Sequence, residues 1–271
     1  MRKLTFIAIA WLFMSQFALH AQGLYFGLGG GYGMPSGLAD NSYHTNSTYT
    51  SSSISLGSGA DLGVYVGYMM NKNIGLELGI SDKFVSGATT TSSDTGSFGS
   101  SNKQTFEGGM LRFTPAIRLQ TGDGNIKVYS VTGLVIGMPM SVTNENVSTP
   151  NSSFGSTTDD VITYSGGISI GFHGALGVLY MINDKIGIFG ELSAYLQNWS
   201  PGEGLYTKYT VNGVDELGQM TTNEKQTNYV SSYTQTGSPS AGSPNQSTFI
   251  YLPYSSFGLN VGIHFSLASS K

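Results

Sequence analysis

The sequence predicts an all-β protein: an eight-stranded antiparallel up-and-down transmembrane β-barrel with long extracellular loops. Eight segments alternate between apolar and small or polar residues, which gives each strand one face for lipid and one for a polar interior. Very short turns alternate with long stretches rich in Ser, Thr, Asn and Gly. The composition agrees, because 38 Gly, 16 Tyr and 14 Phe accompany only 10% charged residues, well below the usual ~25%.

The first element is a predicted signal peptide, residues 1–21. Arg2 and Lys3 form its basic start, an apolar run extends to Met14, and we expect cleavage after Ala21. A retained membrane anchor is the less favoured alternative, since the run is shorter than the ~20 apolar residues that span a bilayer. No later segment of the sequence reaches such a length, which excludes helical spans. Residues 22–271 then form a barrel domain, which we expect in the bacterial outer membrane.

Charge and cysteine content exclude several classes of function. The chain has no Cys, hence no disulfide framework, thiolate metal site or lipoprotein anchor. Loss of Arg2 and Lys3 with the leader changes the formal charge from −4 to −6. This acidity argues against nucleic acid as a partner. No metal-binding motif is present, and we expect no cofactor.

The first three strands follow from clean period-two patterns. Strand 24–34 alternates apolar residues with glycines, and strand 60–70 leads through the turn Asn71–Asn73 into a strand that begins at Ile74. In this third strand Leu76 is expected to face lipid and Glu77 the interior. Two such adjoining segments indicate a hairpin.

The remaining strands continue the pattern. Strand 106–120 places Arg112 and Arg118 inward, and we expect a bulge at Pro115 because proline cannot donate to the ladder. The other predicted strands are 126–138, 164–182, 186–197 and 257–265, with 248–254 extended ahead of the last one. The long external stretches are 35–57, 86–105, 139–161 and 199–247. An even number of strands puts both termini on the periplasmic side.

Aromatic residues are expected to mark the two edges of the membrane. Residues 68–76 and 180–188 share a Tyr-Met-x-Asn-x-x-Ile-Gly pattern, which indicates either duplication or convergence on one hairpin type. Tyr68, Tyr180 and Phe265 are predicted to form a periplasmic girdle. The residues predicted nearer the outer rim are Tyr32, Phe84 and Tyr164.

The chain resembles a known family. The resemblance rests on the leader, the eight alternating strands and segments such as Gly75–Gly79 and Gly258–Phe265. This family is the small outer-membrane β-barrel family that includes the membrane domain of OmpA and the OmpX-like proteins. The resemblance covers nearly the whole mature chain and implies insertion by the barrel-assembly machinery. Two features differ from many members: residues 266–271 continue past Phe265, and we expect no peptidoglycan-binding domain after the barrel.

Function has to be sought in the lumen and the loops. An eight-stranded barrel is only wide enough for its own side chains, so the inward charged residues should meet there. These are Asp61, Glu77, Lys83, Arg112, Arg118, Lys127, His173, Glu191 and His264. Unpaired buried charges are costly, and we expect ion pairs such as Glu77 with Arg118 and Asp61 with Arg112. The lumen is interpreted as a polar plug, with a narrow gated path as the alternative.

An enzymatic role is not favoured. His173 and Glu191 lie on neighbouring strands, as in some lipid-modifying barrels, but no motif places a serine nucleophile beside them. Three roles stay open: a structural or surface-interaction protein, a porin-like narrow channel, and an adhesin or ligand-capturing protein. The expected partners are outer-membrane lipid and lipopolysaccharide, the assembly machinery, and an unidentified extracellular ligand bound by the loops. The protein is expected to be a monomer.

Overall fold

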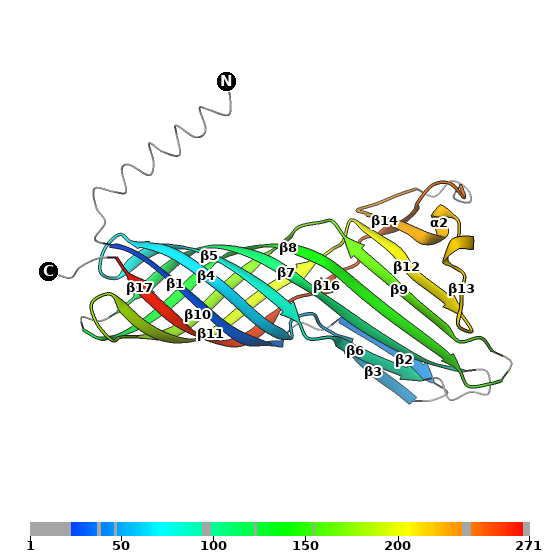
Figure 1. Cartoon of the computed structure of the whole chain (residues 1–271), viewed down its shortest axis with the longest axis horizontal. Coiled ribbons are helices and arrows are strands. Elements are labelled where there is room, and N and C mark those ends of the chain that lie inside the picture. The colour runs from blue at the N-terminus through cyan, green and yellow to red at the C-terminus, as the bar shows by residue number, and fades with distance from the viewer. Residues whose placement is uncertain are drawn as a thin grey trace, which may run out of the picture.

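The barrel strands form a closed ring. The computed structural model describes residues 23–36, 39–45, 48–93, 99–121, 124–153, 155–234 and 240–267, and within these, eight strands build the ring. They are β1 (Leu24–Pro35), β4 (Gly59–Met69), β5 (Ile74–Val85), β7 (Ser100–Gln120), β8 (Ile126–Pro150), β10 (Ser169–Met181), β11 (Ile186–Trp199) and β17 (Ser256–Ser266). Every neighbouring pair is antiparallel, and β17 closes the ring against β1 (Figure 1). The predicted fold class is confirmed, while the predicted signal peptide lies outside the described residues.

Odd and even residues of the barrel strands face different surroundings. On β5, Leu76 is 52% exposed, whereas the side chain of Glu77 beside it is 11% exposed. Large apolar side chains are exposed in the same alternating way on β10 and β17. Hydrocarbon offers backbone groups no hydrogen-bond partner. A sheet can therefore span a membrane when its ladder is closed and its outer surface is apolar.

The two similar hairpins share one turn chemistry. The Asn71 side-chain oxygen accepts hydrogen bonds from the backbone N–H groups of Asn73 and Ile74, both at 2.9 Å. Asn183 does the same for Lys185 and Ile186, also at 2.9 Å. Asparagine favours such turns because its side chain can replace a backbone acceptor. The repeated Asn position therefore has a local physical cause.

The long external stretches are largely strands, which corrects the expectation of loops. Beyond the ring, β7 and β8 continue and are joined by β6 (Ala88–Ser93), β9 (Thr158–Ser165), β12 (Glu203–Val211), β14 (Gln226–Val230) and β15 (Asn245–Thr248). We call these strands, with residues 100–107 of β7 and 142–150 of β8, the outer sheet (Figure 1).

Smaller elements accompany the outer sheet. The hairpin β2 (Ala39–Thr45) and β3 (Thr48–Ile54) lies beside β6, and β13 (Val214–Asp215) and β16 (Leu252–Pro253) add short pairings to β12 and β11. The described helices are η2 (Leu217–Gln219) and α2 (Thr222–Lys225). Neither of these two helices is long and apolar enough to span a membrane.

Threonine explains why polar stretches form this sheet. The hydroxyls of Thr89 and Thr105 lie 3.2 Å apart across β6 and β7, and those of Thr163 and Thr207 lie 3.3 Å apart across β9 and β12. Threonine is β-branched and favours strands, and opposed threonines form stabilising cross-strand pairs. A composition typical of loops therefore builds a ladder once two such segments are aligned.

The predicted strand 164–182 is two strands, β9 and β10. Gly166 and Gly167 separate them with φ angles of 72° and 75°, which glycine adopts without a steric penalty. The Trp199 indole N–H donates to the Gly166 carbonyl at 3.0 Å. At this break the chain passes from β9, which pairs with β12, to β10, which pairs with β11. The stretch 248–254 is likewise divided, between β15 and β16.

The expected bulge at Pro115 is also wrong. The β7–β8 register runs from Phe113 opposite Ile136 to Ala116 opposite Gly133 without a shift, and Pro115 keeps its place opposite Leu78 of β5. The register shift lies instead between Glu107 and Gly109, where the outer sheet begins. The bulge thus bends the sheet where it leaves the ring, and the proline is accommodated within the ladder.

Glycines inside the ring make room for tyrosines, which gives a test of the packing. A Cβ on Gly67 would overlap the ring of Tyr25, whereas a Cβ on Gly190 would meet nothing within 4 Å. Gly67→Ala is expected to lower the free energy of unfolding by about 1–3 kcal/mol, as overpacking does, and Gly190→Ala to leave it nearly unchanged. Denaturant titration in lipid vesicles, read by gel mobility, measures both. Equal effects of the two substitutions would contradict the packing.

Candidate functional site in the barrel lumen

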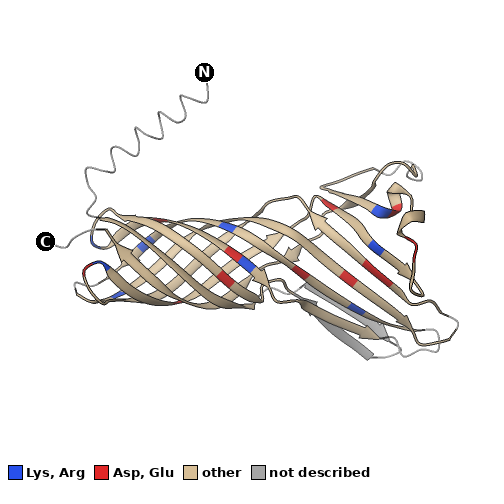
Figure 2. Ribbon diagram, viewed as in Figure 1, with Lys and Arg blue, Asp and Glu red and all other residues tan. Residues whose placement is uncertain are grey.

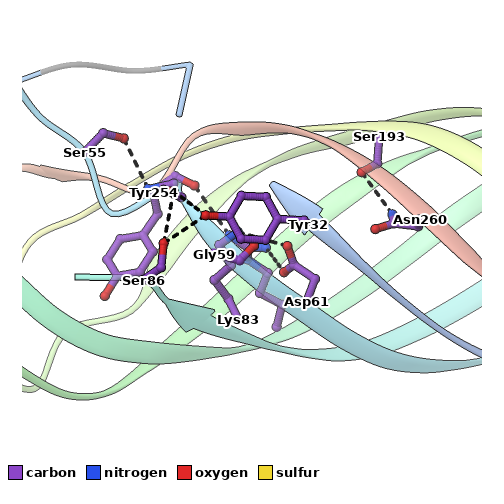
Figure 3. Close-up of polar contacts among 12 residues, drawn as sticks. Tyr32, Ser55, Gly59, Asp61, Lys83, Ser86, Ser193, Tyr254 and Asn260 are labelled. Atoms are coloured by element: carbon purple, nitrogen blue, oxygen red, sulfur yellow. Dashed lines mark hydrogen bonds and ion pairs between the residues drawn. The ribbon is translucent and has the colours of Figure 1, made fainter. Parts of the chain in front are cut away.

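Three charged side chains form the outer layer of the lumen. Asp61 accepts from Arg112 at 2.9 Å through one carboxylate oxygen and from Lys83 at 3.0 Å through the other. Lys83 also donates to the Gly59 carbonyl at 3.0 Å (Figure 3). The register makes these contacts possible, because Asp61 lies opposite Lys83 across β4 and β5. Both cations are fully buried, and this outer layer contains one of the two pairs expected from the sequence.

A second layer lies nearer the short turns. Arg118 contacts Glu77 at 3.2 Å, the other expected pair, and Tyr25 donates to the same carboxylate at 2.9 Å. The guanidinium carbon of Arg118 also lies 3.9 Å from the ring centroid of Tyr129. Such cation–π contact suits a desolvated arginine. The inner layer therefore supports its ion pair with aromatic faces.

Glu191 belongs to the inner layer but is held by neutral donors. The Tyr129 hydroxyl donates to it at 2.9 Å and the Asn260 amide at 3.1 Å. Among the described residues it has no ion pair within 4 Å. The outer layer carries two cations and one carboxylate, and the inner layer one cation and two carboxylates. The six charged side chains of the two layers sum to zero, and their charge is polarised along the barrel axis.

The two lumen histidines have different surroundings. His173 stacks on Tyr195, with ring centroids 4.4 Å apart, and neither of its ring nitrogens has a hydrogen-bond partner in the described part of the chain. His264 lies 3.1 Å from the Tyr65 hydroxyl through Nδ1. His173 lies opposite Tyr195 in the ladder, and Glu191 lies opposite Gly177. His173 and Glu191 therefore form no hydrogen bond with each other, although both line the same cavity.

A cavity of about 90 Å³ lies between the two layers. Its walls include Asp61 from the outer layer, Glu77, Arg118 and Glu191 from the inner layer, and His173. A water molecule needs roughly 10–15 Å³ of such space and several polar partners. The cavity can hold a few waters, which would supply partners for His173. Its volume is far below the several hundred Å³ of a typical ligand pocket.

An apolar cap closes the outer end of the lumen, and sequence reasoning missed it. Its buried members are Leu56, Phe106, Met110, Val142, Tyr164, Trp199, Leu252 and Tyr254. The cap rests on the outer layer, because Arg112 donates to the Tyr254 carbonyl at 3.4 Å. Its residues come from stretches taken for solvated loops or strand ends, so no single segment shows the pattern. Tyr164, expected near the lipid rim, is buried within it.

The remaining sequence-predicted residues lie at the barrel's ends. Tyr68, Tyr180 and Phe265 all lie near the short turns, and Phe265 stacks on Phe26 with centroids 4.9 Å apart. Tyr32 and Phe84 are exposed on the opposite rim, where the Tyr32 hydroxyl lies 3.1 Å from that of Ser86 (Figure 3). Lys127 lies near the start of β8. The aromatic girdle itself stays a prediction.

Tyrosines are the lumen residues that the sequence analysis did not count as partners. Tyr25, Tyr129 and Tyr195 are buried and contact charged groups of both layers. A usable signal was present, since each occupies an inward position by strand parity, and Tyr25 and Tyr129 lie opposite inward glycines. No group of three or more His, Cys, Asp or Glu residues able to hold a metal occurs in the described ranges.

Comparison with known proteins finds similarity to solved structures at low sequence identity. The chain matches no protein-family model and no curated protein. It is similar to the crystal structure of outer membrane protein OprG from Pseudomonas aeruginosa, with 12% identity and a TM-score of 0.45 over 90% of this chain and 95% of that one. It is also similar to Acinetobacter baumannii CarO, with 15% identity and a TM-score of 0.26 over 88% and 96% of the two chains.

The chain's own geometry decides its location. Its ladder closes on itself, its outer face is apolar, and its interior is charged and neutralised. These are the properties of an outer-membrane barrel. The protein is an integral outer-membrane β-barrel.

The ion pair of the inner layer can be tested by substitution. Glu77→Leu leaves the Arg118 charge buried without its carboxylate and is expected to lower the free energy of unfolding by about 3–5 kcal/mol. Adding Arg118→Met should restore part of this loss. Denaturant titration in vesicles measures both, and losses that simply add would contradict the pairing.

The outer sheet provides a matched control for this pair. Lys208 lies 3.7 Å from Glu145, with side chains 41% and 50% exposed. Glu145→Gln should change the unfolding free energy by less than about 1 kcal/mol, because water already solvates both groups.

Proposed function

We propose that this protein is a non-enzymatic surface protein of the outer membrane whose filled barrel anchors the outer sheet. The observation that carries the proposal is the contrast between the two halves. The lumen is occupied by two charged layers and an apolar cap. The outer half is a folded sheet of seven strands with polar and aromatic side chains. A protein with this arrangement acts through the surface that it presents.

The lumen contacts favour a plug over a channel. Arg112 and Lys83 are both fully buried and both held by Asp61. Moving either cation aside would leave charge unpaired in a poorly solvated interior, which is costly. The cap adds the side chains of Trp199 and Tyr254, whose rings lie 6.4 Å apart across the outer end. A narrow ion path is therefore the less supported alternative.

The same contacts disfavour an enzyme. Catalysis by a nucleophile needs a base within hydrogen-bonding reach of it. His173 is stacked on Tyr195, and Glu191 is bonded to Tyr129 and Asn260. Each candidate group is thus engaged in packing or hydrogen bonding within the lumen.

We also propose membership in the small outer-membrane barrel family of the OmpA membrane domain and the OmpX-like proteins. The predicted leader, the short turns and the terminal strand pattern support it. The same proposal includes monomeric insertion by the barrel-assembly machinery and contact with lipopolysaccharide. The described residues of 100–107, 142–165 and 200–248, which lie beyond the ring, contain eight acidic and three basic side chains, a net charge of −5. Figure 2 shows acidic residues along the outer sheet, a charge that disfavours nucleic acid.

Conductance measurements test the filled lumen. The purified full chain in planar bilayers is expected to give no steady single-channel steps. A variant with Arg112→Ala and Tyr254→Ala removes both the guanidinium that donates to the Tyr254 carbonyl and the tyrosine ring of the cap, and it should produce measurable openings. Steady, sizeable steps from the unmodified chain would contradict the plug and favour the channel.

Single-cysteine labelling tests which half faces outward, since the chain contains no Cys of its own. Thr207→Cys on the outer sheet is expected to react with a membrane-impermeant maleimide on intact cells. Asp184→Cys in a short turn should react only after the outer membrane is opened. The reverse pattern would contradict surface display by the outer sheet.

A further inference from the structure

One face of the outer sheet gathers three tyrosines over amide and carboxylate groups. In one row across β8, β9 and β12, Asn144 lies opposite Ile162, and Ile162 lies opposite Tyr206. In the next row on the same face, Asn146 lies opposite Asp160, and Asp160 lies opposite Tyr209. Residues directly opposite in a ladder share one face. We call this the tyrosine face; it comprises Tyr206, Tyr209, Tyr229, Asn144, Asn146 and Asp160.

The aromatic rings on this face are partly exposed, and contacts between rings fix their orientations. The rings of Tyr206 and Tyr209 are perpendicular, with centroids 6.1 Å apart. Tyr229 on β14 packs against the buried Tyr164, with centroids 6.2 Å apart. Tyr206, Tyr209 and Tyr229 each keep part of their surface accessible. They are therefore ordered rings that a ligand can still reach.

The polar groups beneath the rings are buried and incompletely paired. Asp160 is 7% exposed and Asn144 is 6% exposed. Asn146 donates to one oxygen of Asp160 at 3.2 Å, while the side-chain oxygen of Asn144 has no partner among the described residues. Burial raises the pKa of the Asp160 carboxyl. A buried acceptor without a donor is costly, so this face is suited to a ligand that supplies hydroxyl donors.

The charges exclude an anionic ligand. Within the described sheet, Lys208 is directed to the opposite face, where it contacts Asp159 and Glu145. The tyrosine face itself carries one carboxylate and no cation. A protein partner would need a broad apolar centre, yet Ile162 is the aliphatic side chain between these rows.

The remaining chemistry is that of a sugar. A pyranose ring has an apolar C–H face that packs on an aromatic ring, and neighbouring hydroxyls that hydrogen-bond to planar amides and carboxylates. Tyrosine supplies an apolar body and a polar end together. We propose that the tyrosine face binds a neutral oligosaccharide, with Tyr206 and Tyr209 stacking on sugar rings and Asp160 and Asn144 accepting from hydroxyls. This inference rests on the proposed surface role.

The test uses the full chain in phospholipid nanodiscs, which avoids sugar-headed detergents. Calorimetric titration is made with maltotriose, mannotriose, N-acetyllactosamine and its sialylated form. At least one neutral sugar should bind, and the sialylated form should bind more weakly than its neutral parent. Asp160→Ala and Tyr206→Ala should each weaken that binding by about tenfold or more, as loss of one such contact does.

Two exposed tyrosines away from this face provide matched controls. Tyr233→Ala and Tyr251→Ala, at residues 41% and 64% exposed, should leave the affinity unchanged. Asn144→Ala, which removes the unpaired oxygen, should lower it.

Three outcomes would overturn the inference: no neutral sugar bound at millimolar concentration, equal effects of face and control variants, or capture of a protein through the same tyrosines. Steady conductance from the same nanodisc protein fused into bilayers would instead overturn the surface role itself. Failure of the sugar inference and failure of the proposed function are therefore distinguishable.

Discussion

Neutralisation of charge inside a narrow lumen is the constraint on which this structure depends. Asp61 receives two buried cations, while Arg118 serves Glu77 and lies over Tyr129. Because the barrel is too narrow for bulk water, each ionised group needs a partner on another strand. Those partners lie on β4, β5 and β7, so the ion pairs also hold the register of these strands. The same ion pairs therefore neutralise the charges of the lumen and fix the alignment of the strands.

The faces of the barrel strands could be predicted from sequence because period-two alternation survives wherever lipid and lumen differ. Leu76 and Glu77 illustrate it, and the two expected ion pairs followed from parity with opposite charge. Lys83 was not counted as a second partner of Asp61, although the short turn Asn71–Asn73 sets the register that places the two residues opposite each other. Pairing between strands that no short turn joins depends on the shear of the barrel, which alternation along one strand does not encode. The tyrosine partners of Glu77 and Glu191 could not be predicted from the sequence, because they also depend on the shear.

The outer half was harder to predict because no lipid imposes an apolar pattern there. Ser- and Thr-rich segments such as 86–105 have the composition of loops, yet their β-branched threonines pair once β7 and β8 extend. The apolar cap has a different cause. Its members come from segments far apart in sequence, such as Leu56, Val142 and Leu252, and each looks like an isolated apolar residue in a polar stretch.

The glycine break between β9 and β10 has a consequence for how such a molecule can change. Gly166 and Gly167 divide β9 from β10, and near that point Trp199 of β11 lies opposite Leu252 of β16. The joint separates the barrel strands from the outer sheet, whose Val142 and Tyr164 also pack in the apolar cap. Substitutions and insertions in β9 and β12 can alter the outer sheet while the barrel strands keep their own pairing. We therefore expect sequence variation to be greater in the outer sheet than in the barrel strands on the other side of Gly166 and Gly167.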